Sequence, residues 1–193
     1  GQPKGVMIEH GGPINMAWWH RHLFELAQNN RVLQFFSFSF DATVLEILPT
    51  LFSGAALVLC QRTVTQDTRL LEQFLNHHQI NIAALPPVVL ALLTEVELPH
   101  LTTLISGGEA CPPAVVGALA AERQFINSYG PTECSVCASI YCCTGDETGS
   151  LPIGVPIANT QLYILDSNNA PVPQGVPGEL HIAGAGLARG YLN

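Results

Sequence analysis

One short stretch of the chain combines side chains suited to nucleotide binding, Asn127-Ser128-Tyr129-Gly130-Pro131-Thr132-Glu133. Its glycine can adopt dihedrals that are closed to other residues and its proline fixes φ, so the turn should hold its neighbours stiffly. Tyr129 offers a stacking surface, Thr132 a hydroxyl for a phosphate, and Glu133 a carboxylate for Mg²⁺. The alternative interpretation is a strand-ending turn with a half-buried tyrosine, and composition alone favours it.

The elements before this turn predict how its side chains are positioned. Strand-like apolar runs lie at residues 6–8, 31–40, 55–60, 81–85, 103–106 and 124–129. Helical patterns lie at residues 11–28, 41–52, 67–78, 86–95 and 112–122. This alternation predicts an α/β fold with a largely parallel, helix-covered sheet. Ligands of such sheets bind beyond the carboxyl ends of strands, which is where Asp41, residues 84–86, residues 106–109 and the 127–133 turn fall.

Two of these elements carry more detailed expectations. Phe36, Phe38 and Phe40 alternate with serines, which predicts that the strand beginning at residue 31 continues to residue 40. The next helix is expected to bury one apolar side, formed by Val44, Leu45, Leu48 and Leu51.

The pattern changes after Glu133. Strands are expected at residues 135–142, 161–165 and 179–183, with no convincing helix between them. The linkers between these strands are rich in proline, glycine, asparagine and serine. We therefore expect an α/β core over residues 1–134 and part of a smaller, β-rich, barrel-like subdomain over residues 135–193.

Composition excludes several classes of protein. Of the 193 residues, 48% are hydrophobic and 11% are charged, which is typical of a buried globular core and not of disorder. The formal charge is −8 and no Lys/Arg cluster occurs, so we expect no nucleic-acid partner. The longest apolar run, residues 82–93, is too short to span a membrane and contains Pro86-Pro87, so we expect no membrane partner. Neither end looks natural, and we expect an internal fragment of a longer protein.

The cysteines and histidines suggest metal or redox chemistry only weakly. Among the six cysteines, Cys134-x-x-Cys137 has the spacing of a redox or zinc motif. Because the segment has strand character, these two side chains should point to opposite faces and could not chelate together. His20 and His22 lie two apart on a predicted helix and should not share a face. Free thiols in a cytoplasmic protein are the favoured interpretation, with a redox or zinc protein as the alternative.

Five ordered motifs resemble the adenylation domain of nonribosomal peptide synthetases, within the adenylate-forming enzyme superfamily. They are Gly1-Gln2-Pro3-Lys4-Gly5-Val6, Phe38-Ser39-Phe40-Asp41-Ala42, Gly107-Gly108-Glu109, the 127–133 turn, and Gly178-Glu179-Leu180 through Gly184-Ala185-Gly186-Leu187-Ala188-Arg189-Gly190-Tyr191. The resemblance implies ATP- and Mg²⁺-dependent activation of an amino-acid carboxylate, giving an aminoacyl-adenylate and pyrophosphate. It further implies transfer to a phosphopantetheine thiol on a peptidyl carrier domain, with condensation domains in the parent synthetase.

The resemblance also assigns roles in nucleotide binding. Thr132 would hydrogen-bond a phosphate, Glu133 would hold Mg²⁺, and Lys4 would lie near the pyrophosphate. Asn127, Tyr129 and the backbone of Gly107-Gly108 would surround adenine. A solvated tail residue is the alternative interpretation of Lys4.

The amino-acid pocket implied by the family maps onto Asp41, Ala42, Leu45, Ala84, Ile105, Gly107, Ser128, Val136 and Cys137. Asp41 would pair with the substrate's α-ammonium, although a helix N-cap is the simpler interpretation of this residue. The remaining lining is apolar except for Ser128, so we expect a bulky apolar or aromatic substrate. Leu45, Ile105 and Val136 could equally be ordinary core residues.

Several family features lie outside the sequence. The upstream phosphate loop, the ribose-binding Asp and the small C-terminal domain with its catalytic Lys are absent, so the chain alone should not complete adenylation. Two further interpretations remain, an acyl- or aryl-CoA ligase of the same superfamily and a non-catalytic nucleotide-binding fragment. A carboxylate in the acid pocket favours an ammonium-bearing substrate over a fatty acid.

Overall fold

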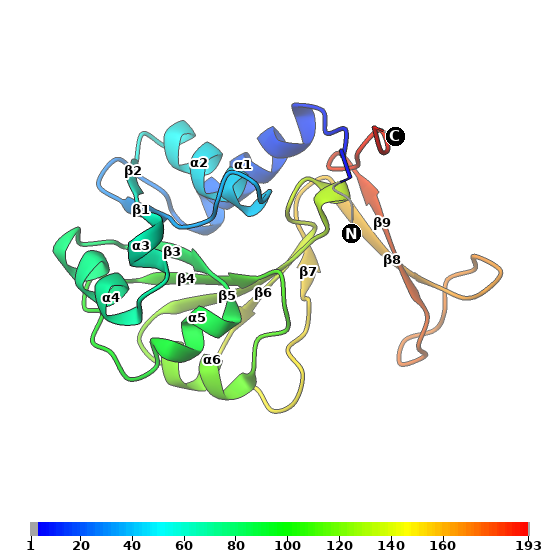
Figure 1. Cartoon of the computed structure of the whole chain (residues 1–193). Coiled ribbons are helices and arrows are strands. Elements are labelled where there is room, and N and C mark those ends of the chain that lie inside the picture. The colour runs from blue at the N-terminus through cyan, green and yellow to red at the C-terminus, as the bar shows by residue number, and fades with distance from the viewer. Residues whose placement is uncertain (1–3, 193) are drawn as a thin grey trace.

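Two sheets organise residues 4–192, the part of the chain that the computed structural model describes (Figure 1). The seven-stranded sheet has the order β2-β1-β3-β4-β5-β6-β7, and the second sheet pairs β8 with β9. The strands are β1 (Arg31–Gln34), β2 (Ala56–Leu59), β3 (Ile82–Leu85), β4 (Thr103–Gly107), β5 (Gln124–Tyr129), β6 (Ser139–Cys143), β7 (Val155–Pro156), β8 (Thr160–Leu165) and β9 (Glu179–Gly184). The α-helices are α1 (Gly11–Leu23), α2 (Ala42–Phe52), α3 (Arg62–Thr65), α4 (Thr68–His77), α5 (Pro87–Leu92) and α6 (Pro113–Leu119).

Strands β1 to β5 pair in parallel, while β6 and β7 are antiparallel to their neighbours. Helices α1 and α2 cover one face, and α4, α5 and α6 pack on the other (Figure 1). Each central strand supplies both cores, because successive side chains point to opposite faces. Ile82 and Ala84 belong to the α1–α2 core, whereas Ala83 and Leu85 belong to the opposite one. The predicted α/β class with a largely parallel, helix-covered sheet is confirmed.

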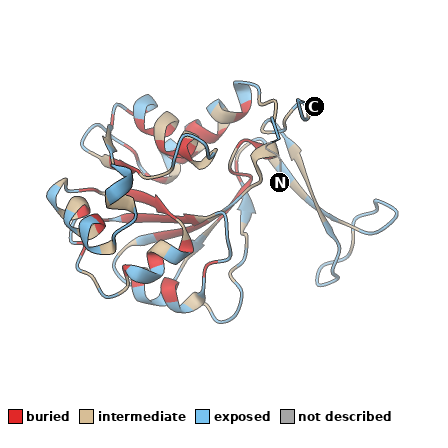
Figure 2. Ribbon diagram, viewed as in Figure 1, coloured by how far each residue is buried: buried red, intermediate tan, exposed pale blue. Residues whose placement is uncertain are grey.

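The antiparallel strands change the expected position of the boundary between sheets. Residues 139–143 and 155–156 continue the main sheet beside β5, and the second sheet begins at Thr160. Figure 2 shows that burial is concentrated in the seven-stranded sheet and the inner sides of its helices, while β8 and β9 are mostly exposed or intermediate. The division into domains at residue 135 stays a prediction, but the change of sheet lies further along the chain.

The predicted strand at residues 31–40 is wrong beyond Gln34. Phe38 and Phe40 are 75% and 63% exposed, and a turn forms in which the Phe40 N–H donates to the Ser37 carbonyl at 2.9 Å. The physical reason is a side chain from α2. The Glu46 carboxylate accepts from the Phe35 N–H at 2.9 Å and from the Phe36 N–H at 3.3 Å, so these amides no longer serve a ladder.

The buried side of α2 also differs from the expected one. The helix spans the predicted residues, but its buried positions are Thr43, Leu45, Glu46, Pro49 and Thr50. Leu51 is 57% exposed and Leu48 is half-buried. Polar residues can occupy this side because their hydrogen bonds are made: the Thr50 hydroxyl donates to the Glu46 carbonyl, and Gln34 donates to the Glu46 carboxylate at 3.4 Å.

Several element boundaries were misplaced by the sequence pattern. The expected strand at residues 6–8 is a single bridge from Val6 to Tyr191, and α1 ends at Leu23. Helices α5 and α6 are shorter than expected, and α3 was not expected. None of the described helices combines the length and the apolarity that crossing a membrane requires.

One buried histidine makes stability dependent on pH. His20 is 0% exposed, its Nδ1–H donates to the Met16 carbonyl at 2.8 Å, and burial lowers its pKa to about 4. Between pH 6.5 and 4, His20 is therefore protonated in the unfolded chain but neutral in the folded chain, so the folded state loses stability as the pH falls. On going from pH 7 to pH 4.5, wild-type protein should lose roughly 2 kcal/mol more unfolding free energy than His20→Gln. Urea unfolding at both pH values measures the difference, and parallel losses in the two proteins would contradict it.

Candidate active site

The loop that follows β1 and the turn that follows β5 meet through one hydrogen bond. The Thr132 Oγ1–H donates to Asp41 Oδ2 at 2.5 Å, across 91 residues of sequence. Asp41 occupies the N-cap position of α2 as expected, but its side chain makes no capping hydrogen bond. The carboxylate instead points from the α2 side of the sheet toward the turn. The structure thus brings together the predicted ammonium-binding carboxylate and the predicted phosphate-binding hydroxyl.

The turn folds back closely on the segment that follows it. A Cβ on Gly130 would lie 2.6 Å from the Val136 carbonyl oxygen and 2.7 Å from the Ala138 nitrogen, so only glycine fits without a backbone shift. Thr132–Cys134 forms a 3₁₀-helix, and Ser135 and Val136 then adopt left-handed φ values of 58° and 74°. The expected strand over residues 135–142 is therefore wrong before Ser139. The tight reversal encloses the turn from which Thr132 reaches Asp41 and Glu133 reaches Tyr191.

Glu133 lies where the two ends of the described chain meet. The Tyr191 hydroxyl donates to Glu133 Oε1, and this hydrogen bond is the main cause that lowers the pKa of the Glu133 carboxyl. Lys4 Nζ lies 5.3 Å from the centroid of the Tyr191 ring. An ionised, accessible carboxylate beside a cation suits a hard metal ion that is shared with phosphate oxygens. Gly1, Gln2 and Pro3, the rest of the predicted phosphate-loop tail, lie outside the described residues.

A cleft of about 940 Å³ opens beside the turn, at the carboxyl ends of β4 and β5. Its walls come from three segments, residues 108–113, 127–131 and 149–153. Gly108, Asn127 and Tyr129, whose adenine-binding role stays a prediction, line it together, and Ser128 lines it as well. Gly107 and Thr132 lie at its border and not in its lining. The cleft has room for a nucleotide, whose site is typically a few hundred Å³.

The third wall, residues 149–153, was missed by the sequence reasoning. It is anchored because the Asn127 side-chain amide donates to the Pro152 carbonyl at 2.8 Å. Since a carbonyl can only accept, the Asn127 amide nitrogen must face this loop, and its oxygen stays available as an acceptor. The segment Gly149-Ser150-Leu151-Pro152-Ile153 has the composition of an ordinary linker, and only its contact with Asn127 reveals its place.

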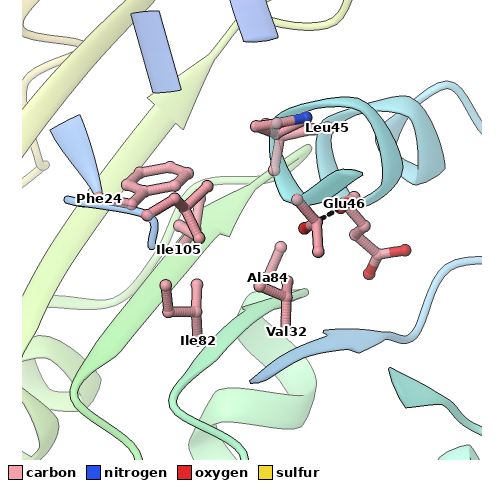
Figure 3. A pocket seen from close by; sticks show the side chains of 10 residues that line it. Phe24, Val32, Leu45, Glu46, Ile82, Ala84 and Ile105 are labelled. Atoms are coloured by element: carbon pink, nitrogen blue, oxygen red, sulfur yellow. Dashed lines mark hydrogen bonds between the residues drawn. The ribbon is translucent and has the colours of Figure 1, made fainter. Parts of the chain in front are cut away.

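The predicted amino-acid pocket divides into two groups of residues. Leu45, Ala84 and Ile105 line a void of about 10 Å³ between α2 and the sheet. Figure 3 shows Leu45 on α2 above Ala84 and Ile105, with Phe24, Val32 and Ile82 around them. The void has the volume of about one water molecule, so these side chains pack as a core. Glu46, which the sequence reasoning did not select, lies on the same lining.

The second group lies at the ends of β4 and β5. Gly107 pairs with Ser128, and a Cβ on Gly107 would lie 3.1 Å from the Ser128 carbonyl oxygen. The Ser128 hydroxyl donates to Cys137 Sγ at 3.3 Å. Burial raises the pKa of the Cys137 thiol to about 11, so it stays neutral. Val136 is half-buried beside this thiol, and Ala42 is the first residue of α2, next to Asp41. The roles of both groups stay predictions.

The strand-face argument against a Cys134–Cys137 site fails, because these residues lie in the 3₁₀-helix and the reversal after it. Both thiols are nevertheless buried, and all six cysteines are free. Over residues 4–192, no group of three or more His, Cys, Asp and Glu side chains is placed to hold a metal ion.

A family model described as "AMP-binding enzyme" matches residues 1–192. The chain belongs to this family. Over its full length it is 48% identical to part of the linear gramicidin synthase of Brevibacillus parabrevis, and 46% identical to part of bacitracin synthase 3 of Bacillus licheniformis. It spans 2% and 3% of the lengths of these two relatives. The resemblance to adenylation domains of nonribosomal peptide synthetases is thereby confirmed for the AMP-binding family and its synthetase members.

A solved structure places the same fold within a larger assembly. The crystal structure of holo-AB3403, a four-domain nonribosomal peptide synthetase bound to AMP and glycine, superposes with a TM-score of 0.90 at 35% identity. The superposition covers 99% of this chain and 15% of that one. The AMP-binding family fold therefore extends through β9 and the loop that carries Tyr191.

Gly130→Ala tests whether the close reversal supports the site. The added methyl group meets three backbone atoms of residues 136–138, which cannot yield as a side chain would. We expect unfolding free energy to fall by about 1–3 kcal/mol, the usual cost of overpacking. Gly11→Ala is the matched control, because its Cβ meets nothing within 4 Å. Urea unfolding measures both variants, and equal stabilities would show that the reversal tolerates a side chain.

Proposed function

We propose that this chain forms the substrate-binding core of an amino-acid-activating ligase in a nonribosomal peptide synthetase. The parent enzyme would join an amino-acid carboxylate to the α-phosphate of ATP, release pyrophosphate, and pass the aminoacyl group to a phosphopantetheine thiol. The hydrogen bond between Thr132 and Asp41 carries the proposal, because it joins an anchor for the substrate's ammonium to a donor for the phosphate. Family membership and the AMP and glycine named for the superposed synthetase support it.

The residues suit a reaction that needs positioning more than covalent help. An oxygen of the amino-acid carboxylate forms the new bond to phosphorus, and the bond from phosphorus to the pyrophosphate oxygen breaks. Asp41 would pair with the ammonium and so fix the attacking carboxylate, while the Thr132 hydroxyl would turn its single proton from Asp41 to the α-phosphate. Glu133 would hold Mg²⁺, which neutralises phosphate charge when bound. Lys4, beside Tyr191, would add positive charge near the leaving pyrophosphate.

The adenine would occupy the cleft between residues 108–113 and 149–153. Tyr129, 37% exposed on its wall, offers a ring for stacking. The Asn127 amide oxygen and the backbone at Gly107-Gly108 would contact the edge of the base. The cleft is large enough for the nucleotide. It adjoins the turn whose Thr132 contacts Asp41, so both substrates would bind beside the same turn.

The proposed substrate is a bulky apolar or aromatic amino acid. The lining contributed by Leu45, Ala84, Ile105 and Val136 is apolar. Glu46 is the one acid on the adjoining void, but burial raises the pKa of its carboxyl to about 8 and its oxygens already accept backbone N–H groups. It therefore offers no free charge to a cationic side chain. Pocket volume would come from movement of Leu45, because the void itself holds about one water.

Partners and location follow from the relatives and stay proposals. We expect peptidyl carrier and condensation domains in the parent, and no nucleic-acid or membrane partner. The free thiols support a cytoplasmic location. The chain spans only a small part of its relatives, and we expect it not to complete adenylation when isolated; ATP turnover with an amino acid by the isolated chain would contradict this expectation.

Asp41→Ala in the parent synthetase tests the assignment. Loss of the carboxylate leaves the ammonium unpaired, so amino-acid-dependent ATP–pyrophosphate exchange should fall by about 100-fold or more. Binding of a non-hydrolysable ATP analogue should change little, because the cleft is intact. Asp146→Ala, at an exposed position in the loop after β6, should leave exchange unchanged. Full activity in Asp41→Ala would instead favour an acyl- or aryl-CoA ligase.

An amino-acid panel tests the proposed side chain. In the same exchange assay on the parent, bulky apolar and aromatic amino acids should give the highest kcat/KM. Small and charged amino acids should give at least tenfold less, since unpaired polar groups are costly in an apolar pocket. Activation of charged amino acids alone would contradict the proposal that the substrate is bulky and apolar or aromatic.

A further inference from the structure

Glu46 is the one buried acid among residues 4–192, and it lies on the helix that begins at the substrate anchor. Its exposed fraction is 1%. Buried carboxyl groups are retained where hydrogen bonds compensate their desolvation, so its partners indicate what it does. Neither the Asp41–Thr132 contact nor the nucleotide cleft includes this side chain.

The partners of Glu46 are the backbone and side chain at the end of β1. Oε1 accepts from the Phe35 N–H at 2.9 Å and from the Phe36 N–H at 3.3 Å. Oε2 accepts from the Phe36 N–H at 3.3 Å and from the Gln34 side-chain amide at 3.4 Å. The Gln34 amide also donates to the Phe36 carbonyl and to Thr43 Oγ1. The Glu46 carboxyl group thus makes most of the hydrogen bonds that join residues 34–36 to α2, and Thr43 adds one to Gln34.

The hydrogen bonds of Glu46 to residues 34–36 fix one end of the short loop that leads to Asp41. Only residues 37–40 separate the anchored Phe36 from Asp41, and all four are exposed. They are held by the turn between Ser37 and Phe40 and by contacts with the first turn of α2, where the Val44 N–H donates to the Asp41 carbonyl at 2.8 Å. Without the carboxyl of Glu46, the N–H groups of Phe35 and Phe36 would lose their partner. The loop could then relax, and Asp41 would no longer face Thr132.

Glu46 also borders the apolar wall of the proposed pocket. It lines the small void together with Leu45, Ala84 and Ile105 (Figure 3). A shift of α2 relative to β1 would therefore move the ammonium anchor and the side-chain wall together. The nucleotide cleft is built from other segments and should not follow.

We propose that Glu46 is a positioning residue for the amino-acid subsite, whose carboxyl fixes residues 34–36 so that Asp41 meets the substrate's ammonium. This proposal rests on the proposed function. It predicts that the reach of an acceptor oxygen at residue 46 matters more than its charge. It also predicts that the amino-acid KM responds to substitution while the ATP KM does not.

The test compares Glu46→Gln, Glu46→Asp and Glu46→Ala in the parent synthetase by ATP–pyrophosphate exchange. Glu46→Gln keeps an oxygen at the same reach, and its amino-acid KM should stay within about threefold of wild type. Glu46→Asp keeps the carboxyl group but withdraws its oxygens by one methylene, so its amino-acid KM should rise at least tenfold. The amino-acid KM of Glu46→Ala should rise by the same factor or more. The ATP KM should stay within about twofold in all three variants.

Ser53→Ala is the matched control for stability. Ser53 follows α2, is buried, and donates to the Pro49 carbonyl at 2.6 Å, far from the end of β1. Its loss should lower Tm without raising the amino-acid KM. A purely structural role for Glu46 would lower Tm and the active fraction in the same way.

Each outcome decides between the two proposals. Equal amino-acid KM values for Glu46→Gln and Glu46→Asp, or equal changes in both KM values, would overturn the positioning role. If Glu46→Ala does not fold, the amino-acid KM values of Glu46→Gln and Glu46→Asp still test the positioning role. Loss of exchange in Asp41→Ala with unchanged Glu46 variants would remove the positioning role alone. Full exchange in Asp41→Ala would remove the proposed function itself.

Discussion

Parallel pairing of β1, β3, β4 and β5 is the constraint on which the rest of the structure depends. It brings the carboxyl ends of these strands to one edge of the sheet, so loops far apart in sequence become neighbours. The register places Ala84 beside Ile105 and Gly107 beside Ser128. The Asp41–Thr132 contact and the cleft beside the 127–133 turn both lie at this edge. The chemistry of the chain therefore follows from strand direction before any single side chain is considered.

Much of this arrangement could be predicted because its signals are local. Apolar runs separated by helical patterns indicated the parallel sheet, and the bounds of α2 and β5 followed from Asp41 and from the Gly-Pro turn. What failed were positions where a distant polar group decides the outcome. The alternation of Phe36, Phe38 and Phe40 with serines is a good strand pattern. The carboxyl group of Glu46 accepts hydrogen bonds from the amides that the strand would need, and no pattern within residues 31–40 shows this.

In the candidate site too, features with local sequence signals were predicted, and features set by distant contacts were not. Tyr129, Thr132 and Glu133 were found from their own types and spacing, whereas the wall at residues 149–153 depends on one contact with Asn127. Cys134 and Cys137 were assigned to a strand because their neighbours are apolar. The close approach at Gly130 instead requires a reversal there, with left-handed residues that sequence propensity disfavours. Tertiary contacts at the site thus override local preference where the function is proposed to lie.

The two edges of the seven-stranded sheet differ in a way that bears on self-association. At one edge, β7 is two residues long and ends in Pro156, which has no N–H to offer a further strand. At the other, β2 presents the apolar run Ala-Leu-Val-Leu, with Leu59 66% exposed and no charge or proline within it. Unprotected edges of this kind template the addition of strands. Of the two edges, the β2 edge is therefore the one whose backbone is open to pairing with a further strand.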